Sequence, residues 1–208
     1  MIDNDLYQTY LTSILSGDKS ECLNIVKTLL DDEIKIQKLY TELFQKSMYE
    51  VGELWELNKI SVAREHLATT ITESMLSATY PYLFTGIQAS KKAIISCTAN
   101  EYHQLGGKMV ADIFELHGWD AHFLGANTPV KELLELIDDI KPDLVGLSLS
   151  VYFNLPSLKT SLDHIKGHYD QLDILVGGHA FTWGGTSLLN KYSGVHYLES
   201  LTQLEADL

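Results

Sequence analysis

The spacing of the apolar residues changes near residue 86, and no other feature of the sequence constrains the fold as strongly. Before this point, apolar residues recur every three or four positions, which is typical of amphipathic helices. Short polar breaks at Gly17-Asp18, Asp31-Asp32 and Asn58-Lys59 separate these helical runs. Three breaks leave four helices, so residues 1–86 are expected to form a four-helix bundle.

From residue 91 onward, short apolar runs alternate with amphipathic segments. The predicted strands are 93–99, 120–125, 144–150, 173–178 and 195–199, and the predicted helices are 104–117, 129–139, 155–167 and 180–191. Such alternation is typical of a parallel sheet with helices on both faces. We therefore expect residues 91–208 to form an α/β domain of the flavodoxin-like (Rossmann-like) type, built on a five-stranded parallel sheet.

Charge and composition exclude several classes of protein. The 28 acidic and 15 basic side chains give a net charge of −13, which repels a phosphate backbone, so we expect no direct nucleic-acid partner. The N-terminus lacks the basic and apolar regions of a signal peptide, and no apolar run reaches membrane-spanning length, so we expect a cytoplasmic protein without a membrane partner. Cys22 and Cys97 are too few for a disulfide framework or a cysteine-rich zinc site, and both are expected to be buried.

In a sheet of this type, ligands bind outside the carboxyl ends of the strands, where the strand order reverses. The first loop at this edge contains Glu101, His103 and Gly106. A neutral imidazole at this position can bind a metal, and Glu101 can accept the other ring N–H and so fix the tautomer. Gly106 lets the next helix begin close to a bulky ligand. The alternative is a surface histidine at a helix start, because so short a pattern often arises by chance.

Two further loops contain small residues. Ser148 and Ser150 follow the third strand, and Gly177 and Gly178 end the fourth. Paired glycines let a flat ligand approach the backbone, and a serine hydroxyl can bond a buried ring nitrogen. Neither loop matches a dinucleotide or nucleoside triphosphate fingerprint, so nucleotide cofactors fit the sequence poorly.

Together, Glu101-x-His103-x-x-Gly106, Ser148 and Gly177-Gly178 resemble the cobalamin-binding domain family, whose pattern is D-x-H-x-x-G, S-x-L and GG. The resemblance covers residues 91 to about 200, and the preceding bundle is similar to the helical cap of that family. It implies a cobalamin cofactor with His103 as the lower cobalt ligand and the nucleotide tail buried beside the serines and glycines. Glu101 departs from the usual aspartate, and Ser150 from the usual leucine.

The bundle carries a second resemblance. Trp55 precedes Glu65-His66 in a W-x9-E-H pattern that is similar to the cobalamin-dependent photoreceptors, in which the tryptophan shelters a 5′-deoxyadenosyl group. The segment FLGANTP is similar to the same branch. The resemblance implies that Trp55, Glu65 and His66 contact adenosylcobalamin at its upper face. Glu56 stands where the carotenoid-gene regulators have a histidine that binds cobalt after photolysis. The alternative is that Trp55 packs in the core and Glu65-His66 is merely exposed.

The resemblance favours a light-responsive regulator that is not an enzyme and that acts through a protein partner or self-association. Its expected ligand is adenosylcobalamin, with methylcobalamin or hydroxocobalamin as alternatives. Two other functions remain open at this point. One is a corrinoid carrier protein of a methyltransferase system, and the other is a haem-binding sensor of the same fold.

Overall fold

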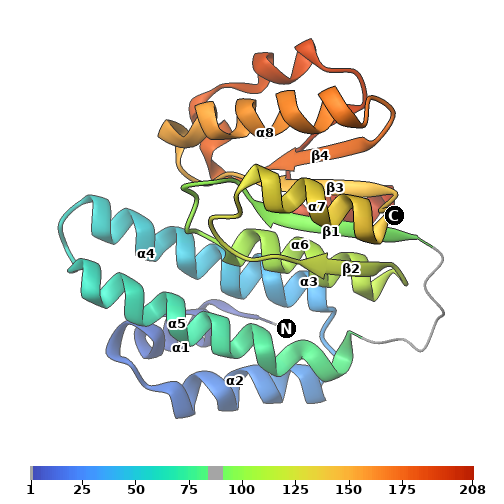
Figure 1. The fold of residues 1–208 in the computed structure, drawn as a ribbon. Coiled ribbons are helices and arrows are strands. Elements are labelled where there is room, and N and C mark those ends of the chain that lie inside the picture. The colour runs from blue at the N-terminus through green and yellow to red at the C-terminus, as the bar shows by residue number, and fades with distance from the viewer. Residues whose placement is uncertain (1, 84–90) are drawn as a thin grey trace. The chain divides into compact units, whose positions relative to one another are not determined.

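A computed structural model describes residues 2–83 and 91–208 of the chain (Figure 1). The chain divides into two compact units, residues 1–83 and 84–208, which we call the helical unit and the sheet unit. The predicted domain boundary near residue 86 lies outside the described residues. The chain forms a helical unit followed by a five-stranded parallel sheet with helices, and this confirms the predicted fold class.

The helical unit contains four helical runs. The first two are α1 (Asn4–Ser16) and α2 (Lys19–Asp31), and the fourth is α5 (Val62–Thr79), which is followed by the short turn η2 (Tyr80–Tyr82). The third run joins α3 (Ile36–Leu39), the π-helical segment η1 (Tyr40–Gln45) and α4 (Lys46–Glu56) without a break. The predicted breaks are all found at the ends of these runs.

Local chemistry explains these ends. The Asp3 carboxylate accepts a hydrogen bond from the Leu6 N–H at 2.9 Å and so caps the start of α1, which ends at Gly17 in the left-handed region. Inside the unit, the Phe44 ring packs against the rings of Tyr10 and Tyr40, with centroids 6.0 and 5.8 Å away. The apolar stripes predicted from the sequence therefore meet in an aromatic core.

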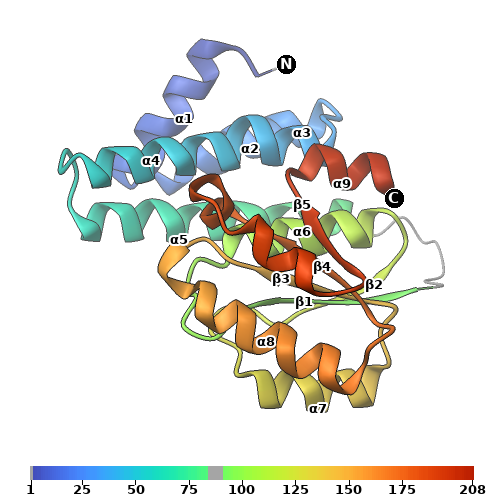
Figure 2. The same cartoon turned by 90° about the horizontal axis from the view of Figure 1, so that it is seen from above.

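The sheet unit alternates strands with helices and short 3-10 turns. Its elements are β1 (Lys92–Cys97), α6 (Leu105–Leu116), β2 (Asp120–Phe123), α7 (Val130–Ile140), β3 (Leu144–Ser148), η3 (Tyr152–Asn154), α8 (Leu155–His168), β4 (Asp173–Gly177), η4 (His179–Trp183), η5 (Thr186–Lys191), β5 (Val195–Leu198) and α9 (Leu201–Asp207). The strands are parallel in the order β2-β1-β3-β4-β5. Figure 2 shows α7 and α8 on one face of this sheet and α6 and α9 on the other.

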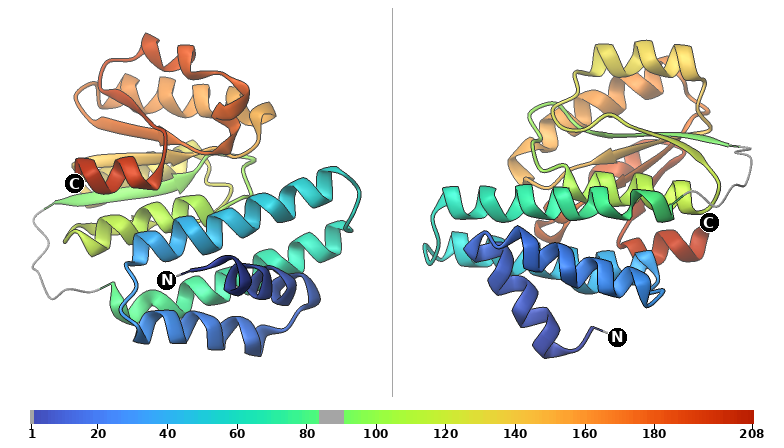
Figure 3. Two further views of the ribbon diagram at one scale, coloured as in Figure 1. Left: turned by 180° about the vertical axis from the view of Figure 1, so that it is seen from behind. Right: turned by 90° about the horizontal axis from the view of Figure 1, so that it is seen from below.

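Two features of the sheet unit differ from the sequence predictions. Residues 180–191 do not form one helix but parts of η4 and η5, because Gly184 and Gly185 interrupt them with φ angles of 113° and 97°. The C-terminal helix α9 was not predicted, and it packs beside α6 (Figure 3). The reversal of strand order lies between β1 and β3, so their carboxyl ends mark the ligand-binding edge of this fold.

Candidate functional site

Glu101 and His103 form the centre of the candidate site, on the loop between β1 and α6. The Glu101 Oε1 atom accepts hydrogen bonds from the His103 backbone N–H at 2.9 Å and from His103 Nδ1 at 2.7 Å. The Glu101 side chain is fully buried, whereas 61% of the His103 side chain is exposed. An ionised carboxylate leaves the proton on Nδ1, so Nε2 carries the lone pair that can bind a metal.

The other carboxylate oxygen of Glu101 reaches the loop after β3. Glu101 Oε2 accepts hydrogen bonds from the backbone N–H groups of Ser150 and Val151, both at 2.9 Å. Burial by itself would raise the pKa of this carboxyl, but the hydrogen bonds from His103, Val151 and Ser150 outweigh burial and lower the pKa to about 2. Glu101 therefore stays ionised near neutral pH and fixes both the His103 ring and the β3 loop.

Three asparagines that the sequence analysis did not single out brace the same loops. The Asn154 side chain donates to the Asn100 carbonyl at 3.0 Å and to Glu101 Oε2 at 3.3 Å. The Asn127 side chain accepts from the Asn100 N–H at 2.8 Å, and the Asn127 N–H donates to the Glu101 carbonyl at 2.8 Å. Asn100 and Asn127 have positive φ angles, which asparagine tolerates better than most residues. The segment FLGANTP therefore has a structural role beside Glu101.

Small residues line one face of the sheet next to this centre. Cys97, Ser148 and Gly177 stand side by side in the registers of β1, β3 and β4. A hydrogen bond joins the Ser148 side chain to Cys97, and burial raises the pKa of the Cys97 thiol to about 12, with a further contribution from the charge of Glu101. Cys97 is therefore an un-ionised thiol, and both cysteines are buried as expected.

The predicted glycines have two different roles. A Cβ atom at Gly106 would meet nothing within 4 Å, so the start of α6 has open space beside it. Gly178 has a φ of 122°, and its Cβ would lie 2.2 Å from the Leu149 carbonyl oxygen. The Ser150 backbone N–H, rather than its hydroxyl, donates the hydrogen bond to Glu101. Gly106 thus leaves room for a ligand, whereas Gly178 is required by the backbone.

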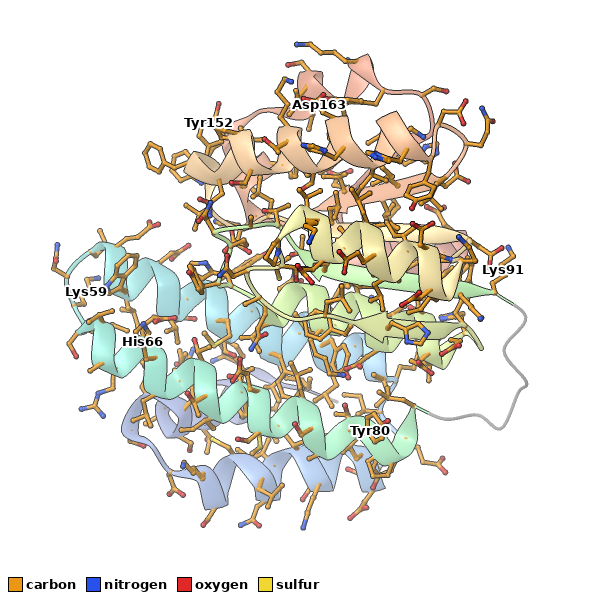
Figure 4. All side chains as sticks on the ribbon, in the orientation of Figure 1. Lys59, His66, Tyr80, Lys91, Tyr152 and Asp163 are labelled. Atoms are coloured by element: carbon orange, nitrogen blue, oxygen red, sulfur yellow. The ribbon has the colours of Figure 1, made fainter. Side chains whose placement is uncertain are left out.

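The site residues expected in the helical unit lie on α4 and α5. Trp55, near the end of α4, is 47% exposed. On α5, Glu65 accepts a hydrogen bond from the Thr69 hydroxyl at 2.9 Å and lies 3.6 Å from His66 Nε2. Most of the His66 side chain is exposed (Figure 4). The exposure of Trp55 excludes simple core packing, and the ligand role of these three residues stays a prediction.

Comparison with protein families decides between the ligands that this geometry permits. Residues 91–205 match the B12 binding domain, and residues 6–79 match a second B12 binding domain family. The chain belongs to the B12-binding family. It is therefore a cobalamin-binding protein, and cobalamin is favoured over haem.

The individual relatives include corrinoid proteins and transcriptional repressors. The dimethylamine corrinoid protein of Methanosarcina barkeri is 22% identical, over 99% of this chain and 97% of its own length. The HTH-type transcriptional repressor CarH of Myxococcus xanthus is 24% identical, over 83% of this chain and 58% of its own length. The structure of the Methanosarcina barkeri monomethylamine corrinoid protein matches with a TM-score of 0.84 and 14% identity, over 99% of this chain and 98% of that one.

The residues of this cobalamin-binding protein fit the cofactor. The imidazole of His103 suits cobalt, and the Glu101 carboxylate supplies the hydrogen bond that commonly orients a metal-binding histidine. Next to them, Gly106 leaves open space at the start of α6, whereas Cys97 and Ser148 lie against Gly107 of α6, and a Cβ at Gly177 would lie 3.0 Å from the Leu198 carbonyl oxygen. Within residues 2–83 and 91–208, no cluster of three or more His, Cys, Asp or Glu side chains could hold a bare metal ion, and no helix is long and apolar enough to cross a membrane.

Proposed function

We propose that this protein is a corrinoid carrier of a methyl-transfer system, and not an enzyme in its own right. The observation that carries this proposal is the similarity to the dimethylamine corrinoid protein, which extends over both units and nearly the whole of both chains. The match to CarH covers just over half of that repressor. The comparisons thus support the carrier function, which was an alternative in the sequence analysis, better than the light sensor.

The residues of the chain have binding and orienting roles in this proposal. A bound corrinoid supplies a cobalt centre that accepts and releases a methyl group. His103 would hold the cobalt, while Glu101 keeps the proton on His103 Nδ1 and so presents Nε2. Because Glu101 is also hydrogen-bonded to the β3 loop, the imidazole is held in one orientation. Catalysis of methyl transfer would belong to partner proteins that dock transiently.

The light sensor remains a second candidate because of two specific observations. These are the similarity to CarH and the W-x9-E-H pattern formed by Trp55, Glu65 and His66. A sensor must bind adenosylcobalamin in preference to methylcobalamin, and its assembly must change when light breaks the cobalt–carbon bond. A carrier needs neither property, so the two functions differ in what can be measured.

The test compares the two cobalamins in darkness and after green light. The carrier function predicts similar dissociation constants for methylcobalamin and adenosylcobalamin in dark titrations followed by absorption. It also predicts that size-exclusion chromatography of the adenosylcobalamin complex gives the same elution volume before and after illumination. A strong preference for adenosylcobalamin, together with a light-dependent change in elution volume, would overturn the carrier function in favour of the sensor.

A further inference from the structure

The loops around His103 form an uncharged surface on an acidic protein. Four loops at the carboxyl edge of the sheet comprise residues 98–104, 124–129, 149–154 and 178–185. Glu101, which is fully buried, is their only Asp, Glu, Lys or Arg side chain, and His103 and His179 are their histidines, although the whole chain carries a net charge of −13. A surface of this kind does not favour a charged ligand.

The same loops expose large aromatic side chains. Tyr102 is 67% exposed, Tyr152 41%, Phe153 90% and Trp183 69%. We call these four residues the aromatic shelf. Figure 4 shows Tyr152 at the edge of the sheet unit, beside the first turn of α8. Because large exposed apolar patches on a protein surface often mark interaction sites, the aromatic shelf is a candidate ligand-binding surface.

Hydrogen bonds tie the aromatic shelf to the residue that orients His103. Tyr102 lies between Glu101 and His103 in the chain, and the N–H of Val151 just before Tyr152 donates to Glu101 at 2.9 Å. The turns η3 and η4, which carry Tyr152, Phe153 and Trp183, contact each other. Glu101 and the contact between η3 and η4 therefore join the loops that carry the aromatic shelf to the His103 ring.

We propose that the aromatic shelf contacts the corrin ring of the bound cobalamin and fixes its rotation about the axis through cobalt and His103. This inference rests on cobalamin binding at His103, but not on the choice between carrier and sensor. The corrin macrocycle is broad and apolar on its faces, and its rim carries uncharged amides. An uncharged aromatic surface contacts such a ring without removing water from a charged group. The family resemblance implies that the nucleotide tail lies elsewhere, beside Ser148, Gly177 and Gly178.

The experiment uses cobinamide, a corrin that lacks the nucleotide tail, beside cobalamin. The double variant Phe153→Ala/Trp183→Ala is titrated with both ligands, followed by absorption. We expect both affinities to fall by a similar factor, at least about fivefold, because each ligand has the corrin ring. Ser148→Ala is expected to weaken cobalamin binding alone. Tyr82→Ala, which removes a 46% exposed aromatic side chain from the helical unit, is the matched control.

Each other outcome contradicts the proposal. A loss for cobalamin alone would assign the aromatic shelf to the nucleotide tail. Unchanged affinity for both ligands would show that the surface serves another contact, such as a partner protein. If thermal unfolding shows that the double variant is misfolded, the milder single variants Phe153→Leu and Trp183→Leu are titrated in its place. A similar loss of affinity for both ligands supports the contact, and unchanged affinities reject it.

Discussion

Replacing Glu101 with glutamine removes one charge at the point where the His103 loop and the β3 loop meet. The carboxylate accepts the His103 N–H and ring Nδ1 on one oxygen, and the Ser150 and Val151 N–H groups on the other. The amide of a glutamine has only one acceptor atom. Whichever way it turns, its NH2 group faces at least one buried backbone N–H, and the mismatch cannot be relieved.

The pKa of Glu101 gives the size of the effect. A fall from the ordinary 4.5 to about 2, at about 1.4 kcal/mol for each unit of pKa, corresponds to roughly 3 kcal/mol of stability at neutral pH. Since the pKa is lower in the folded state, this stability is fully present above pH 4.5 and is lost as the pH falls toward 2. By pH 3, roughly 2 kcal/mol of it is gone.

Urea unfolding of the cobalamin-free protein measures this difference. We expect Glu101→Gln to lower the free energy of unfolding by about 3 kcal/mol at pH 7, and by only about 1 kcal/mol at pH 3. Glu101→Asp, which keeps the charge and restores the usual residue of the family motif, should cost less than Glu101→Gln at pH 7. An equal loss at both pH values for the glutamine variant would refute the argument, because the carboxylate charge would then contribute nothing.

Three further substitutions test other parts of the site. Gly106→Ala should stabilise α6 in the cobalamin-free protein by up to about 1 kcal/mol, measured by urea unfolding. The same substitution should weaken cobalamin binding about tenfold, measured by titration, and unaltered affinity would mean that the ligand does not use this space. Gly178→Ala should lower the free energy of unfolding by more than about 3 kcal/mol, since its Cβ would strike the Leu149 carbonyl, and a stable variant would contradict the backbone geometry. For a carrier, Trp55→Ala should change the affinities for methylcobalamin and adenosylcobalamin by the same factor, whereas a selective loss for adenosylcobalamin would favour the sensor.

Much of the fold follows from local patterns in the sequence. The helical periods and polar breaks predicted the four runs of the helical unit, and the five apolar runs predicted the strands. The prediction of one helix at 180–191 was wrong because the backbone at Gly184 and Gly185 overrides the apolar pattern around them. Helix α9 was missed because it is short, and its stability comes from packing beside α6 rather than from a strong period of its own.

The candidate site was only partly predictable for a different reason. Glu101 and His103 lie two residues apart, so a motif reveals them. Asn127 and Asn154 belong to loops that are distant in sequence, and they meet Glu101 only once the sheet has formed. The second role of Glu101, in holding the Ser150 and Val151 N–H groups, depends on the same long-range packing. The segment FLGANTP was the one available signal, and it was attributed to a family branch rather than to structure.

The most direct test of the role of His103 is to identify which nitrogen atom binds the cobalt. This is measured in the complex reduced to the cob(II)alamin state. The protein is produced with 15N-labelled histidine and loaded with unlabelled cobalamin, and its electron paramagnetic resonance spectrum is compared with that of the unlabelled protein. If His103 is the lower ligand, the nitrogen superhyperfine triplets of the unlabelled complex become doublets on labelling, and they disappear in His103→Ala. Triplets that persist in the labelled protein would show that the nucleotide base of cobalamin still binds the cobalt, and would contradict the role assigned to His103.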